Sequence, residues 1–218
     1  MSTRSPAIAK LVWIAVFGIA FGFVEASVVV YLRGLYYPGG FTFPLKRMSD
    51  MHLVVELLRE ASTIVMLGAA AILAGSRLWE RFGYFLVAFG LWDLFYYIWL
   101  KAMLDWPSSL TEWDILFLLP VPWIGPVIAP AVIALAMTAA GIFLVLRLAR
   151  GGYFRPMLLS WICAASATAI ILYSFTADVA ATLGRQLPSP YRYSLLVAGI
   201  VLYGVGLITA SRQHASAR

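Results

Sequence analysis

The chain has 218 residues, of which 62% are hydrophobic and only 12% charged, and its formal net charge is +6. A soluble domain is typically about half apolar and about a quarter charged, so this composition excludes an ordinary soluble protein and predicts an integral membrane protein. Its apolar runs are long and lack the roughly 10-residue alternating segments of an outer-membrane barrel. The basic residues lie mostly at the ends of those runs, which argues against a nucleic-acid partner.

Six apolar segments are long enough to cross a bilayer, which takes about 20 residues for a helix. We therefore expect an all-α, polytopic bundle forming a single transmembrane domain over residues 1–218, with membrane lipid around it. The first segment could instead be a signal peptide, because Arg4 and Lys10 precede its apolar core and residues 24–26 resemble a cleavage site. The apolar run continues to Leu32, however, which favours a retained helix. The predicted spans are residues 11–32, 52–74, 84–104, 124–147, 157–180 and 193–210.

The segment before the fourth span is unusual because it is rich in proline. A short apolar run, residues 115–119, is followed by four prolines: Pro120, Pro122, Pro126 and Pro130. Proline removes a backbone donor and breaks helices, so we expect a short interfacial or re-entrant helix, a break, and then the fourth span. Glu112 and Asp114, which precede the run, are expected to mark the outer water boundary.

The distribution of basic residues between the spans predicts the orientation of the chain. With a cytoplasmic N-terminus, the inside carries Arg4, Lys10, Arg77, Arg81, Arg147, Arg150, Arg155, Arg212 and Arg218, and the outside carries Arg33, Lys46, Arg47, Arg185 and Arg192. The inside excess predicts that both termini are cytoplasmic. Arginine greatly outnumbers lysine, as in GC-rich genomes, so we expect a bacterial cell (plasma or inner) membrane.

Carboxylates inside the predicted spans are the strongest functional signal. Such a group costs roughly 2.5–3.5 kcal/mol at the centre of a membrane helix and usually faces the interior of a bundle. Four acidic residues qualify, namely Glu25, Glu56, Glu60 and Asp93. In the predicted orientation they all lie in the outer half of the membrane.

Helical periodicity places these acids on three faces that should meet in one outward-facing pocket. On the second span, the polar residues within a narrow arc are His52, Glu56, Arg59 and Thr63, with Glu60 at its edge. On the third span, the residues that repeat every fourth position are Asp93, Tyr97 and Lys101, with Tyr96 close by. Glu25 shares a face with Gly18 and Gly22, a GxxxG pair that allows close helix packing.

The charges of this pocket do not balance. The four acids face only two compensating bases, Arg59 and Lys101, so protons or a bound cation must offset the excess. Carboxylates with one imidazole suit a divalent metal, for which the candidate ligands are Glu25, His52, Glu56 and Glu60. The candidate catalytic groups are Glu56, Asp93 and Tyr97. In the alternative, purely structural interpretation, Glu56 pairs with Arg59 and Asp93 pairs with Lys101 to fix the helix packing.

Several chemistries are excluded by missing motifs. Cys163 is the single cysteine, His214 lies in the C-terminal tail, and the chain has no HExxH, GxSxG or Gly-rich phosphate loop. Three functions remain open, and the sequence does not decide whether the protein is an enzyme. The pocket could bind a cation or dock a membrane-protein partner, or it could belong to a metal- or carboxylate-dependent enzyme acting on a lipid, a quinone or a small extracytoplasmic substrate. A proton- or cation-coupled transporter is disfavoured, because the inner halves of the spans offer only hydroxyls.

Overall fold

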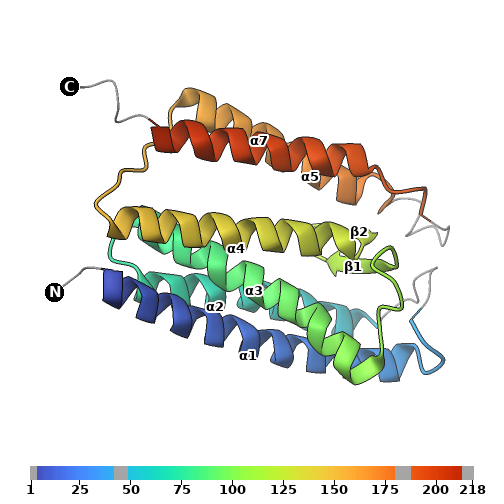
Figure 1. The fold of residues 1–218 in the computed structure, drawn as a ribbon. Coiled ribbons are helices and arrows are strands. Elements are labelled where there is room, and N and C mark those ends of the chain that lie inside the picture. The colour runs from blue at the N-terminus through green and yellow to red at the C-terminus, as the bar shows by residue number, and fades with distance from the viewer. Residues whose placement is uncertain (1–3, 42–48, 180–187, 213–218) are drawn as a thin grey trace.

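The computed structural model describes residues 4–41, 49–179 and 188–212. Within these ranges the chain forms six helices that are long and apolar enough to cross a membrane, together with one β-hairpin (Figure 1). The elements are α1 (Arg4–Tyr36), α2 (Asp50–Ala74), α3 (Leu78–Leu104), β1 (Trp113–Phe117), β2 (Trp123–Pro126), α4 (Ile128–Ala149), α5 (Leu158–Thr176) and α7 (Tyr193–Arg212). The chain is therefore an all-α, multi-pass membrane protein, and the six predicted spans are confirmed with shifted ends.

The proline-rich segment forms a hairpin, so the predicted short helix is wrong. Strands β1 and β2 pair antiparallel, with Trp113 opposite Pro126 and Ile115 opposite Ile124. The alternating aromatic and β-branched side chains of this segment favour a strand over a helix. Pro120 and Pro122 fall in the connection and Pro126 at the end of β2, where they remove no donor that the two-stranded ladder needs. Pro130 lies in the first turn of α4, where a backbone N–H has no partner within the helix. Helix α4 consequently begins at Ile128 rather than at residue 124.

Helix α3 lies at the centre of the bundle, in contact with α1, α2 and α4. The predicted GxxxG face of α1 packs on α3: a Cβ added at Gly22 would lie 2.8 Å from the carbonyl oxygen of Trp92. On the other side of α3, a Cβ added at Gly90 would lie 2.4 Å from the carbonyl oxygen of Ala134 in α4. Glycine is required at both crossings because the helix backbones touch.

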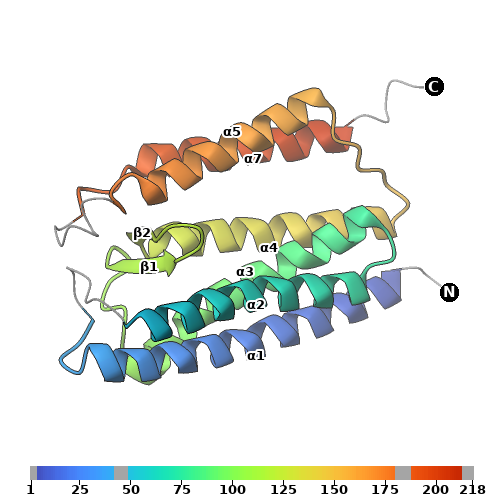
Figure 2. The same ribbon diagram turned by 180° about the vertical axis from the view of Figure 1, so that it is seen from behind.

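Different elements lie at the two opposite ends of the bundle (Figures 1 and 2). The start of α1 and the end of α7 lie at one end. The hairpin, the end of α1 and the start of α2 lie at the other, which we call the hairpin end.

Six spans place both termini on one side of the membrane, and their cytoplasmic location stays a prediction. Four residues in the charge count lie outside the described residues: Lys46, Arg47, Arg185 and Arg218.

Candidate functional site: a charged cavity at the hairpin end

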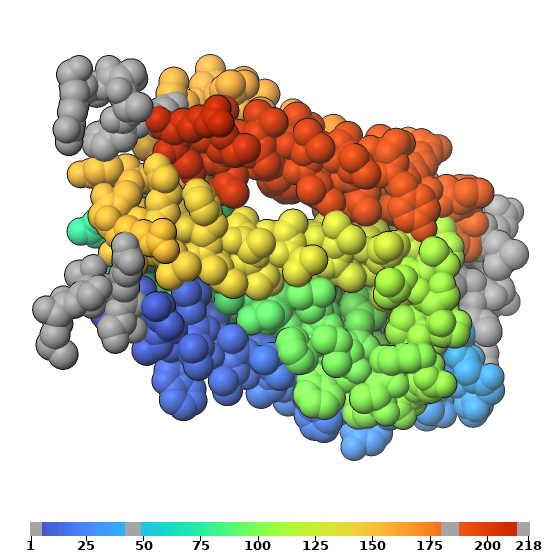
Figure 3. All heavy atoms as spheres, in the orientation of Figure 1, coloured from blue at the N-terminus to red at the C-terminus, as the bar shows by residue number. Residues whose placement is uncertain are grey.

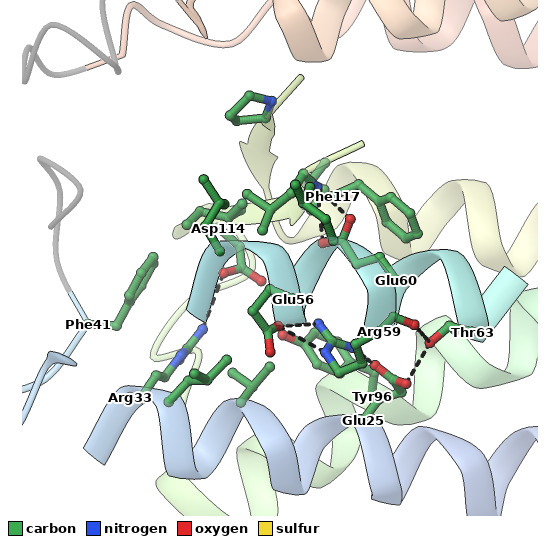
Figure 4. A pocket seen from close by; sticks show the side chains of 18 of the residues that line it. Glu25, Arg33, Phe41, Glu56, Arg59, Glu60, Thr63, Tyr96, Asp114 and Phe117 are labelled. Atoms are coloured by element: carbon green, nitrogen blue, oxygen red, sulfur yellow. Dashed lines mark hydrogen bonds and ion pairs between the residues drawn. The ribbon is translucent and has the colours of Figure 1, made fainter. Parts of the chain in front are cut away.

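A cavity of about 800 Å³ opens at the hairpin end, between α1, α2, α3 and the hairpin (Figure 4). Three of the predicted acids, Glu25, Glu56 and Glu60, lie on its wall and are each at least 94% buried. The charged residues that line it are Glu25, Asp50, Glu56, Glu60, Asp93 and Asp114 as acids and Arg33 and Arg59 as bases. The described residues therefore give the cavity six carboxylates and two guanidiniums.

Arg59 joins α2 to α1 through two carboxylates. Its guanidinium donates to Glu25 of α1 and to Glu56 one turn earlier on α2, the latter with its Nε at 2.9 Å. Thr63, a turn further along α2, donates its hydroxyl to the other oxygen of Glu25 at 2.7 Å. This network explains why the second span carries its polar residues on one face. The Glu56–Arg59 pair expected from the sequence is present, and Glu25 extends it to a second helix.

Glu60 connects α2 to the hairpin through hydrogen bonds to its carboxylate. The backbone N–H of Leu118 lies 3.0 and 2.9 Å from the two carboxylate oxygens of Glu60. Leu118 follows the last residue of β1, where the strand pairing ends, so its N–H needs an acceptor from elsewhere in the fold. The carboxylate supplies it, and this requirement is not visible in the sequence of α2.

Arg33 and Asp114 form a buried ion pair that ties the hairpin to α1. Arg33 Nη2 lies 3.2 Å from Asp114 Oδ1, and the two side chains are only 9% and 4% exposed. Tyr97 of α3 donates its hydroxyl to the second oxygen of Asp114 at 3.2 Å. The Arg33 guanidinium also lies over the ring of Trp106, 3.6 Å from its centroid. Asp114 thus lies buried inside the protein rather than in contact with water, and its depth in the membrane stays a prediction.

Burial determines the acidity of Asp114. Desolvation raises the pKa of this carboxyl from 3.8 to about 6, although Arg33, the backbone N–H of Ile115 and the Tyr97 hydroxyl act in the opposite direction. Desolvation thus outweighs one guanidinium and two hydrogen bonds. Asp114 is therefore an acid that changes charge close to neutral pH in a position that holds the hairpin.

Asp93 lines the cavity without a partner. Its carboxylate makes no hydrogen bond or ion pair with any residue in the described part of the chain. The pairing expected with Lys101 is wrong, because Lys101 lies near the exposed end of α3 and its Nζ is 2.6 Å from Asp105 Oδ1. The second base of the cavity is Arg33 instead. Asp93 is thus a carboxylate available to a ligand.

The predicted metal site is not supported by the arrangement of the donors. Among the residues that the structure describes, no three His, Cys, Asp or Glu side chains lie close enough to hold a metal ion. His52 lies at the first turn of α2, where Ser49 caps the helix, and its Nδ1 hydrogen-bonds the hydroxyl of Tyr36. His52 is not among the residues that line the cavity. His214 lies outside the described residues.

Arg33, Asp50 and Asp114 are charged cavity residues that the sequence did not predict for the pocket. The sequence places Arg33 in a loop, because it follows the predicted end of the first span at Leu32. The apolar and aromatic residues that continue around it, from Tyr31 to Tyr37, were the available signal that the helix extends further.

The chain is thus a multi-pass membrane protein with a charged cavity at one end of its bundle. No protein-family model, curated protein or solved structure matches it.

Proposed function

We propose that this membrane protein binds a small organic cation in the charged cavity at its hairpin end. The observation that carries the proposal is the unpaired carboxylate of Asp93 in a cavity where six acids face two bases. Both guanidiniums are already engaged, Arg59 by Glu25 and Glu56 and Arg33 by Asp114. An excess of buried negative charge must be offset by protons or by a cation, and a cationic ligand would supply both charge and hydrogen bonds.

The lining of the cavity supports an organic cation. Aromatic side chains surround the carboxylates, and their faces attract ammonium groups. These aromatic residues are Tyr36, Tyr37, Phe41, Trp92, Tyr96, Tyr97 and Phe117. A volume of about 800 Å³ also lies within the range of about 300–1,000 Å³ typical of small-molecule pockets. An alkylammonium or arylammonium ion of moderate size therefore suits this cavity better than a bare metal ion.

Direct binding of matched ligands tests the proposal. Purified protein in detergent is titrated by calorimetry with choline and with 3,3-dimethylbutanol, its uncharged carbon isostere, and then with benzylamine and benzyl alcohol. We expect the charged member of at least one pair to bind and its neutral isostere to bind at least about 10-fold more weakly, a difference of about 1.4 kcal/mol. Equal affinity within both pairs, or no binding by any of the four, would contradict the proposal.

Two matched variants locate the binding site. Asp93→Asn removes the unpaired carboxylate of the cavity and should weaken cation binding at least about 10-fold. Asp105→Asn makes the same chemical change on an exposed residue near the end of the same helix and should leave the affinity unchanged. Equal affinities in the two variants would place any cation binding elsewhere.

Two other outcomes would favour the alternative functions. A ligand recovered chemically altered would favour the membrane-enzyme alternative, with Asp93 or Glu56 as the acid–base group. Co-purification of another membrane protein that competes with the cation would favour the docking alternative.

We also propose that the cavity faces away from the cytoplasm in a bacterial cell membrane, which rests on the predicted orientation.

A further inference from the structure

A cluster of arginines lies at the end of the bundle opposite the cavity. The guanidinium of Arg147, near the end of α4, donates to the carbonyl oxygens of Tyr153 and Ser211. The backbone N–H of Arg155 donates to the carbonyl of Ala210 at 3.2 Å, and Arg212 lies two residues beyond Ala210. None of these three arginines forms an ion pair with an acid in the described part of the chain. The fold thus brings three arginines, none of them in an ion pair with a described acid, to one end of the bundle.

A crevice separates α4 from α7 beside this cluster. At the hairpin end the two parts of the bundle meet through a buried cluster that includes Ala129 of α4 and Leu196 of α7. At the opposite end they meet through the contact between Arg147 and Ser211. Between these contacts, the space-filling view has an opening between α4, in yellow, and α7, in red (Figure 3). Gly204 of α7 lies in the middle stretch, and a Cβ added there would have no atom within 4 Å.

The crevice has apolar walls at membrane depth. On α7, Gly204 and Leu207 continue the face of Ile200, which packs against the buried cluster at the hairpin end. On α4, Met137 and Ala140 continue the face of Ile133, which packs against the same cluster. Water has no polar partners in such a space, and an empty gap would forfeit the dispersion contacts of its walls. Hydrocarbon is therefore its natural occupant.

We infer that an anionic phospholipid binds here, with one acyl chain in the crevice and its phosphate at Arg155 and Arg212. The two features support each other, because the arginine cluster lies at the end of the apolar crevice. Basic pockets between transmembrane helices recognise anionic head groups in this way. A partner helix would fill the crevice but would leave the three positive charges without an anion. The site is separate from the charged cavity and does not depend on its function.

Retention of lipid by the purified protein tests the site. The protein is exchanged into detergent, titrated with phosphatidylglycerol or with phosphatidylcholine of the same chains, and examined by native mass spectrometry. We expect one phosphatidylglycerol to bind more tightly than phosphatidylcholine. The double variant Arg155→Gln/Arg212→Gln should weaken phosphatidylglycerol binding about 30-fold, because each arginine near a lipid surface contributes about fivefold. The control Lys101→Gln/Arg192→Gln removes two charges at the hairpin end and should change nothing.

A second pair of variants tests the crevice without touching the charges. Gly204→Leu fills open space, so it should fold normally and yet lower retention of the lipid. Gly68→Leu is the matched control, since Gly68 of α2 also has no atom within 4 Å of an added Cβ. It should retain the lipid as the wild type does. A Gly204→Leu variant that retains lipid equally would overturn the crevice as the chain site.

The head group has one further control. Glycerol 3-phosphate carries the same phosphate chemistry without acyl chains, and it should displace the lipid only at concentrations far above those of the lipid itself. Displacement at equal concentration would show a site for free phosphate and overturn the lipid assignment. Equal binding of the two phospholipids by the wild type, or an unchanged affinity in the arginine double variant, would overturn the head-group assignment.

Discussion

Replacing Arg33 by methionine should destabilise the fold in a manner that depends on pH. The substitution keeps most of the apolar stem but removes the guanidinium that pairs with Asp114 at 3.2 Å. Above pH 6, where the wild-type carboxylate is ionised beside Arg33, the variant must either keep a buried charge without its cation or protonate it, since loss of Arg33 raises the pKa of Asp114 further. Removing one partner of a buried ion pair costs about 3–5 kcal/mol. Loss of the contact with the Trp106 ring adds about 0.5–2 kcal/mol at any pH.

The pKa of Asp114 fixes the pH range of this effect. In the wild type its folded-state pKa of about 6 lies above the unfolded value of 3.8. Between these two values the unfolded chain has lost the proton and the folded chain keeps it. Stability therefore falls as pH rises from about 4 to 6, by about 1.4 kcal/mol per unit and about 3 kcal/mol in all. Below pH 6 the carboxyl becomes neutral in the fold, so mainly the loss of the contact with the Trp106 ring remains there.

Unfolding of the detergent-solubilised protein at pH 5 and pH 8 measures the effect. Arg33→Met should cost about 4 kcal/mol or more at pH 8 and about 1–2 kcal/mol at pH 5. In an Asp114→Asn background the difference between the two pH values should vanish. The control Arg192→Met removes an exposed arginine of the same end and should have little effect at either pH. A cost for Arg33→Met that is equal at both pH values would refute the reasoning.

Two further predictions concern packing and the hairpin. Gly90→Ala should cost at least about 2 kcal/mol, because its Cβ would lie 2.3 Å from the hydroxyl oxygen of Thr138, whereas Gly68→Ala should be neutral or stabilise by up to about 1 kcal/mol. Thermal melting of both variants in one detergent checks this, and similar melting temperatures would contradict it. Glu60→Gln should speed hydrogen exchange of the Leu118 amide, since a neutral acceptor binds that N–H more weakly than a carboxylate. Unchanged exchange at that amide would show that Glu60 does not hold the hairpin.

The sequence by itself determined the membrane class, the six spans and the helix faces that carry the polar residues. These properties are local, because each depends on composition over about 20 residues or on a period of 3.6 residues along one helix. The contact of α1 with a neighbour through Gly18 and Gly22 was predictable for the same reason. So was the pair between Glu56 and Arg59, since both residues lie on one helical turn.

Tertiary structure alone decided which charges meet between different elements of the fold. Arg33 and Asp114 are 81 positions apart, and only the folding of the hairpin back onto α1 brings them together. The hairpin itself depends on strand pairing, which a single segment cannot reveal and which alternation of side chains merely permits. Lys101 and Asp93 share a helix face, yet one side chain reaches Asp105 and the other lines the cavity. Periodicity gives the direction of a side chain from its own helix, whereas its partner depends on distances between elements that the sequence does not state.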